Sequence, residues 1–386
     1  MNAAERELRR RLRERPLPGE TAARRRAWEV VATAHAQRAP ARRRVRPALR
    51  LAPAVAAAAV ALALAVTPAG PALGDWLEER FSSEPAPARP AFARLPDDAS
   101  VLALSRAGAY VVRGDGSLRR VGAFSEAEWS PRGLHVVGVS GRRLVAVTPA
   151  GVQKWTVVRP ARLSHPAWSL GLGYFVAYLE GTRLRVVGGN GQDDRLLRRG
   201  AAAVTPAWRA GPGYVLTYAR PGAVETLDVL TGRSLWVRRV RDAKVLEWSR
   251  RGHRLVILGE RALRVLDGRG RLLRRLALPA AGRATEMVVD AAGRRAAVSM
   301  NGRGGARVVE VPLGGGSRPR VVFSGAGAVE GLAWSPDARR LLVAWRDADQ
   351  WLLLGPRGRV RPLGGVSREL GRSAGFPRVA GWCCSR

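Results

Sequence analysis

The sequence predicts an all-β fold, a seven-bladed β-propeller, over residues 97–386. Three observations support this prediction. An anchor residue recurs about every forty positions, four short strands fit into each repeat, and the two ends of this region supply complementary parts of one blade. Such a period is typical of propellers, because a blade needs neighbours to cover both of its faces. A β-sandwich, or two unrelated β domains, would explain neither the period nor the matching ends.

Each anchor ends a short apolar run and stands just before a turn. The spacings between successive anchors are 39, 40, 40, 41, 45 and 48 residues. Six of the seven anchors are tryptophan, whose large side chain we expect to fill the gap between neighbouring blades. The anchors are Trp129, Trp168, Trp208, Trp248, Val289, Trp334 and Trp382.

Short alternating runs, bounded by Gly, Pro, Asn or Asp, predict the strands between the anchors. Second strands are expected over 135–140, 174–179, 214–219 and 253–258, and third strands over 144–148, 184–187, 225–229 and 263–266.

The two ends of the repeat region complete one another. Residues 101–122 contain about three strands but lack the strand that carries an anchor, and residues 378–384 supply that strand. We therefore predict one composite blade that closes the ring and removes its open edge.

Residues 1–50 form a basic tail with 15 Arg and 5 Glu, a net charge of +10. Helical patterns are visible over 2–15 and over 20–38, where Trp28 lies on an apolar stripe. The tail is either a solvated segment with marginal helicity or a helix that binds anionic headgroups or a cytoplasmic partner.

Residues 51–73 contain no charged side chain and are long enough to cross a membrane as one helix. Arginines precede this segment and carboxylates follow it, so the positive-inside rule predicts a cytoplasmic N-terminus and an extracytoplasmic propeller at the cell membrane. A cleaved signal peptide and a buried soluble helix are the alternatives. Residues 74–96, with four prolines after position 84, predict an extended stalk.

The net charge is +35, from 66 Lys+Arg against 31 Asp+Glu, and all but Lys154 and Lys244 of the basic residues are arginine. Abundant Arg, Ala, Gly and Pro is typical of a GC-rich genome. The charge is therefore poor evidence for nucleic-acid binding, and outside the membrane it permits an acidic protein or envelope partner. Cys383 and Cys384 exclude a disulfide framework, and we expect unbonded thiols, one buried and one near the surface, because a bond between neighbours strains the backbone.

The residue before each anchor is expected to face a narrow central channel. It is uncharged in five blades but is Glu128 or Glu247 in the other two. These carboxylates either pair with arginines or contact a cation or other ligand. No catalytic, metal or cofactor site is predicted. The G-x-S-x-G match over 371–375 lacks the following His that a nucleophile elbow needs, and the four histidines show no metal-ligand spacing.

The W-S-P stretches at Trp129 and Trp334 resemble WD40-like, TolB-like (PD40) propeller repeats, and residues 227–236 resemble a quinoprotein-type blade with a docking tryptophan. The basic helix, single span and outer module resemble bacterial membrane-anchored regulators, including anti-sigma-like proteins. These resemblances imply architecture more than activity.

Three functions follow as hypotheses. The first is a membrane-anchored, non-catalytic binding module, with loops 160–166, 198–206, 241–244 and 365–377 as candidate contacts. The second is a transmembrane sensor that signals through the basic tail. The third, least favoured, is an envelope enzyme that uses Glu128 or Glu247 at the channel mouth.

Overall fold

The computed structural model describes residues 91–96, 98–170, 174–250, 253–279, 282–314, 318–371 and 374–384. These residues belong to one compact unit, Ala88–Arg386. The predicted tail, the predicted membrane segment 51–73 and the stalk up to residue 90 lie outside them. Among the described residues, no helix combines the length and the apolar character that a membrane crossing requires.

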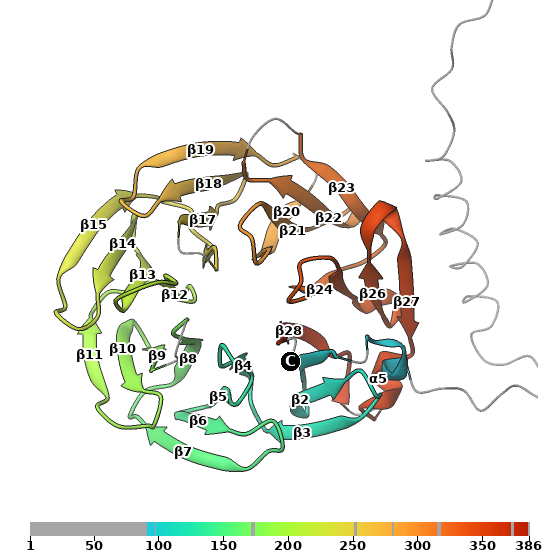
Figure 1. Cartoon of the computed structure of the whole chain (residues 1–386), viewed down its shortest axis with the longest axis horizontal. Helices are drawn as coiled ribbons and strands as arrows, with labels where there is room; N and C mark the ends of the chain where they lie inside the picture. The colour runs from blue at the N-terminus through green and yellow to red at the C-terminus, as the bar shows by residue number, and fades with distance from the viewer. Residues whose placement is uncertain are drawn as a thin grey trace, which may run out of the picture. The chain divides into compact units, whose positions relative to one another are not determined.

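Seven four-stranded antiparallel sheets surround a central axis (Figure 1), which confirms the predicted seven-bladed propeller. Blade 1 contains β4 (Glu126–Trp129), β5 (Val136–Ser140), β6 (Arg143–Val147) and β7 (Gln153–Val158). Blade 2 contains β8 (Leu163–Trp168), β9 (Phe175–Glu180), β10 (Arg183–Gly188) and β11 (Arg195–Arg198). Blade 3 contains β12 (Ala207–Trp208), β13 (Val215–Arg220), β14 (Ala223–Asp228) and β15 (Ser234–Arg239).

Blade 4 contains β16 (Val245–Trp248), β17 (Arg254–Leu258), β18 (Ala262–Asp267) and β19 (Leu272–Ala277). Blade 5 contains β20 (Arg283–Val289), β21 (Arg295–Gly302), β22 (Gly305–Pro312) and β23 (Arg320–Gly325). Blade 6 contains β24 (Val329–Trp334), β25 (Leu341–Trp345), β26 (Gln350–Leu354) and β27 (Val360–Gly364), with short 3-10 turns η2 (Arg346–Ala348) and η3 (Pro356–Gly358). The first strand of each blade lies at the axis.

Blade 7 is the predicted composite of the two ends of the propeller. Its order is β28 (Arg378–Cys383), β1 (Ser100–Ser105), β2 (Gly108–Arg113) and β3 (Leu118–Gly122). The closing pair is antiparallel, with Val101 opposite Trp382. Closure therefore uses main-chain hydrogen bonds between residues far apart in the chain, as Figure 1 shows where the red and cyan strands meet.

A buried Ser or Asp after the anchor stabilises the turn between first and second strands in five blades. Its side-chain oxygen accepts a hydrogen bond from a backbone N–H four to six residues later, as in Ser335 Oγ with Arg340 N at 2.8 Å and Asp290 Oδ1 with Arg294 N at 2.7 Å. The other three are Ser130, Ser169 and Ser249. The W-S signature therefore has a local cause, because this residue pairs a backbone amide that a buried turn would leave unsatisfied.

Two tryptophans of outer strands dock on glycine turns of the following blade. Trp236 on β15 donates its indole N–H to the carbonyl of Gly268 at 3.2 Å, and its ring covers Gly270 so closely that a Cβ there would lie 2.6 Å away. Trp155 on β7 covers Gly191 of blade 2 in the same way. Glycine is required at both turns, where φ is also positive.

Residues 91–94 differ from the extended stalk that the prolines predicted, because they form a 3-10 turn, η1 (Ala91–Arg94), against the propeller. Phe92 is fully buried, with its ring centroid 5.0 Å from that of Trp351. The backbone N–H of Ala91 donates to Glu369 of α5 (Val366–Glu369) at 2.8 Å. Burial of Phe92 outweighs the extended preference of the neighbouring prolines.

Candidate functional site

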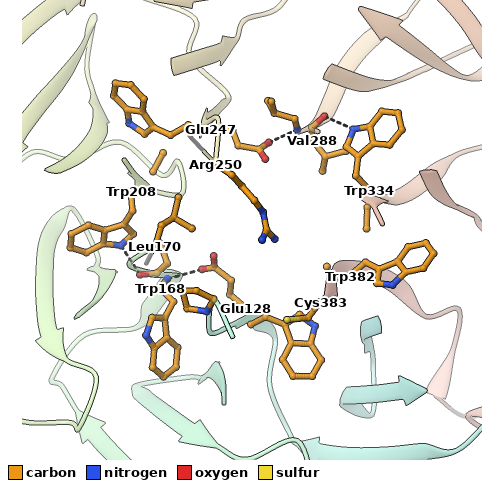
Figure 2. A pocket seen from close by; sticks show the side chains of 18 of the residues that line it. Glu128, Trp168, Leu170, Trp208, Glu247, Arg250, Val288, Trp334, Trp382 and Cys383 are labelled. Atoms are coloured by element: carbon orange, nitrogen blue, oxygen red, sulfur yellow. Dashed lines mark hydrogen bonds between the residues drawn. The ribbon is translucent and has the colours of Figure 1, made fainter. Parts of the chain in front are cut away.

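The first strands of the seven blades surround a cavity of about 370 Å³ on the propeller axis (Figure 2). Its wall consists of the anchors, the residues before them and the first residues of the turns after them. Because every blade contributes, the seven sheets fix the shape of the cavity together. Its lining includes Glu128, Trp168, Trp208, Glu247, Arg250, Val288, Trp334, Gly381 and Cys383.

The anchors pack between blades, and Trp208 and Trp334 are examples of anchors that also join neighbouring first strands directly. The indole N–H of Trp208 donates to the carbonyl of Ala167 at 2.9 Å, and that of Trp334 donates to the carbonyl of Val288 at 3.2 Å. Each acceptor is the residue before the anchor of the preceding blade. Trp129 differs, because its indole nitrogen has no hydrogen-bond partner among the described residues.

Glu128 and Glu247 both line the cavity, and each carboxylate spans to the next blade. Glu128 Oε2 accepts from the backbone N–H of Trp168 at 3.0 Å, and Glu247 Oε2 accepts from that of Val289 at 2.9 Å. Within the described residues, neither forms an ion pair with arginine. They accept hydrogen bonds from backbone amides on the axial edge of a neighbouring sheet. These amides have no further strand beside them to pair with.

Two further carboxylates belong to this set and were missed from the sequence. Glu126, two residues before Glu128 on β4, accepts from the backbone N–H of His165 at 2.5 Å. Glu286 on β20 lies close enough to influence the pKa of Glu247 and is held by the backbone amide of Leu332. Glu126 was predictable, because residues two apart on a strand point to the same side.

Burial raises the pKa of three of these carboxyls, those of Glu128, Glu247 and Glu286, above that of an exposed glutamate. The pKa rises to about 8 for Glu128 and for Glu247, and to about 7 for Glu286. In each case the backbone amide partly opposes the rise. Glu247 is also influenced by Arg250, which lowers its pKa, and by Glu128 and Glu286, which raise it. Near pH 7 the carboxyls of Glu128 and Glu247, which line the cavity, are therefore largely protonated and can donate as well as accept hydrogen bonds.

Arg250 is the one cationic side chain among the described residues that line the cavity. It lies in the turn after Trp248 and is exposed. Figure 2 shows its guanidinium reaching into the middle of the cavity, between Glu128 and Glu247. With the carboxyls protonated, this guanidinium makes the mouth attractive to a carboxylate or other anion.

The other residues singled out from the sequence do not assemble a catalytic or metal site. His135 stacks on Trp168, with ring centroids 6.0 Å apart, and burial lowers the pKa of this histidine. Gly371 and Gly375 belong to the connection between α5 and β28. No cluster of three or more His, Cys, Asp or Glu side chains suited to a metal ion occurs within the part of the chain that the structure describes.

The two cysteines are joined to one another, which corrects the prediction of two separate thiols. The prediction assumed that Cys384 continues the strand, where neighbouring side chains point to opposite sides. Instead Cys384 has a left-handed φ of 46°, which ends β28 and turns its sulfur toward Cys383. Both sulfurs lie at the junction between blade 7 and blade 1.

No protein-family model matches the sequence, and no curated protein matches it. Many solved structures share the fold. One is hydrazine synthase of Kuenenia stuttgartiensis, with a TM-score of 0.51 and 16% identity over 60% of this chain and 76% of that chain. Another is a chain of the mitotic checkpoint complex, with a TM-score of 0.52 and 15% identity over 62% of this chain and 76% of that one. At such identity the likeness shows the propeller fold alone.

Proposed function

We propose that this protein is a membrane-anchored, extracytoplasmic β-propeller that binds a partner protein at the channel mouth without catalysis. The fold is compatible with such a module, and the charge-free segment 51–73, with arginines before it and carboxylates after it, supports the anchor and its orientation. The buried Ser or Asp of the turns further supports a relation of the blades to TolB-like repeats.

One observation carries the binding proposal, namely the chemistry of the mouth around Arg250. The guanidinium enters a rigid cavity whose nearest acidic groups have raised pKa values, so it is free to pair with a carboxylate from outside. The turns between first and second strands, one of which carries Arg250, also expose large side chains in other blades, with Leu134 at 63% and Tyr174 at 54%. A basic centre, with exposed apolar side chains on the corresponding turns of other blades, fits an acidic protein segment that also carries apolar residues.

Site-specific photo-crosslinking tests this proposal on the full chain in its own membrane. A photoreactive residue at Leu134 should yield a discrete adduct with one partner, and Arg250→Glu should remove that adduct. The control position is Val158, which is 56% exposed and lies on β7, the outermost strand of blade 1. Equal adducts from both positions, or an adduct unaffected by Arg250→Glu, would refute the mouth as the binding site.

The anchor is tested separately by fractionation. The full chain should need detergent for extraction, and a chain lacking residues 51–73 should not. A protease added outside the cell should digest a C-terminal tag and spare an N-terminal one. Recovery of a soluble form beginning near residue 70 would instead identify a cleaved signal peptide.

A second function, signalling across the membrane, is favoured by the apolar stripe around Trp28 in the basic tail. Under this alternative, removal of residues 1–40 abolishes the cellular response and leaves anchoring and partner binding unchanged. A response that survives the deletion would exclude it.

A further inference from the structure

The joined pair Cys383–Cys384 lies on a turn of the neighbouring blade, at the junction that closes the ring. The contact is with Gly133, in the turn after Trp129 of blade 1. A Cβ at Gly133 would lie 2.9 Å from Cys384 Sγ and 3.0 Å from Cys383 Sγ. Glycine at this turn therefore provides the space that both sulfurs occupy.

The same turn provides hydrogen-bond acceptors that only free thiols can use. Cys383 Sγ lies 4.0 Å from the carbonyl oxygen of Ser130, and Cys384 Sγ lies 3.7 Å from that of Pro131. A disulfide carries no S–H, whereas a thiol is a weak donor. The surroundings therefore suit the reduced pair as well as the bonded pair.

A reagent can reach the pair through a second cavity, of about 510 Å³. Both cysteines line it, together with two arginines and two carboxylates, Arg113, Arg132, Asp98 and Asp115. Cys383 is only 4% exposed, whereas Cys384 is partly exposed, so Cys384 offers the accessible sulfur.

We propose that Cys383–Cys384 is a reversible thiol–disulfide modification site that reacts with small dithiols. A thiolate of the dithiol attacks Cys384 Sγ, the S–S bond breaks, and its electron pair leaves on Cys383 Sγ, which takes up a proton. The second thiolate of the dithiol then attacks the dithiol's other sulfur, which is bonded to Cys384 Sγ in the mixed disulfide. That bond breaks, and Cys384 leaves as a thiolate and takes up a proton. The protein gains two electrons and two protons, and the dithiol becomes a cyclic disulfide.

Reduction changes how the sulfurs interact at the ring junction. The bonded pair lies over Gly133 and cannot donate a hydrogen bond, whereas each free thiol can donate one to the nearby carbonyl of Ser130 or Pro131. Cys383 also lines the axial cavity. The modification therefore lies between the two cavities, where it alters the wall of each.

Thiol counting on the purified full chain tests the proposal. Maleimide should label no cysteine in the untreated protein and both after dithiothreitol, as read by mass spectrometry of the tryptic peptide 379–386. Under native conditions Cys384 should react faster than Cys383. Phenylarsine oxide, which bridges adjacent thiols, should block both labels after reduction, and oxidised glutathione should restore the unlabelled state.

Matched glycine variants test the role of the blade-1 turn. Gly133→Ala should slow reclosure by oxidised glutathione about tenfold, since a displacement worth ~1.4 kcal/mol in the transition state has that effect. Gly141→Ala, at a positive φ with nothing within 4 Å of the added Cβ, should leave reclosure unchanged. Two free thiols in untreated protein that oxidant does not close, or a pair that dithiothreitol opens only after unfolding, would overturn the proposal.

Discussion

Replacement of the two axial carboxyls by amides tests the electrostatics of the channel. In the double variant Glu128→Gln, Glu247→Gln, each side-chain oxygen can still accept from the backbone N–H of Trp168 or Val289, but it no longer titrates. The exposed Glu260, which pairs with Lys244 at 3.7 Å, provides the control variant Glu260→Gln. The double variant therefore separates two contributions to the free energy of unfolding, that of negative charge in the channel and that of the side-chain hydrogen bonds.

The magnitude follows from the raised pKa values. A carboxyl whose pKa is about 8 in the folded protein and 4.5 in the unfolded chain takes up a proton on folding between these pH values. The unfolded chain binds fewer protons there, so the stability contributed by each carboxyl is complete below pH 4.5 and is lost as the pH rises toward 8. The full shift corresponds to ~5 kcal/mol per carboxyl as an upper bound. Because the mouth is open to water, we expect about 1–2 kcal/mol each.

The assay is thermal unfolding of the full chain at a series of pH values from 5 to 9. At pH 5 the double variant should match the wild type, because protonated glutamate and glutamine are both neutral. At pH 9 it should melt roughly 4–16 °C higher, because the two carboxyls together contribute about 2–4 kcal/mol and each kcal/mol raises the Tm by about 2–4 °C. Glu260→Gln should show no such trend. A double variant whose Tm difference from wild type is the same at pH 5 and pH 9 would refute the raised pKa values.

Three further variants test the packing, each by chemical denaturation. Trp208→Phe should lower the free energy of unfolding by about 1–2 kcal/mol more than Trp129→Phe. The indole of Trp208 donates a hydrogen bond, whereas that of Trp129 has no partner among the described residues. Gly270→Ala should cost about 1–3 kcal/mol more than Gly232→Ala, which shares a positive φ but has open space around the added Cβ. Asp290→Ala should cost roughly 3 kcal/mol, because it leaves buried turn amides unpaired.

The architecture was predictable because its determinants are local and repeated. An anchor, a turn residue such as Ser335 and a glycine recur in the same order, so each repeat reports on the others. The composite blade followed from the count of strands at the two ends. The predicted second strand at 135–140 and the observed β5 (Val136–Ser140) differ by one residue, a typical uncertainty of strand ends.

The axial site was only partly predictable, because bulges shift the side chains that face the channel. Glu286 stands three residues before the anchor Val289, yet the register of β20 shifts between Ala284 and Glu286. A simple count along the strand therefore misplaces it. The bond between Cys383 and Cys384 was missed for a related reason, since a left-handed residue at a strand end has no signature when it is not glycine.

The channel carboxyls should also make the proposed partner binding depend on pH. Each carboxyl accepts a hydrogen bond from a backbone amide on the open edge of the next sheet. This position buries the carboxyl, and burial keeps it largely protonated near pH 7. An acidic partner segment that pairs with Arg250 therefore meets little repulsion at pH 7, but meets two new negative charges above pH 8. We expect crosslinking through Leu134 to weaken severalfold between pH 7 and pH 9 in the wild type and to stay constant in the double variant Glu128→Gln, Glu247→Gln. Equal weakening in both would show that titration of the partner, rather than of the channel, sets the pH dependence.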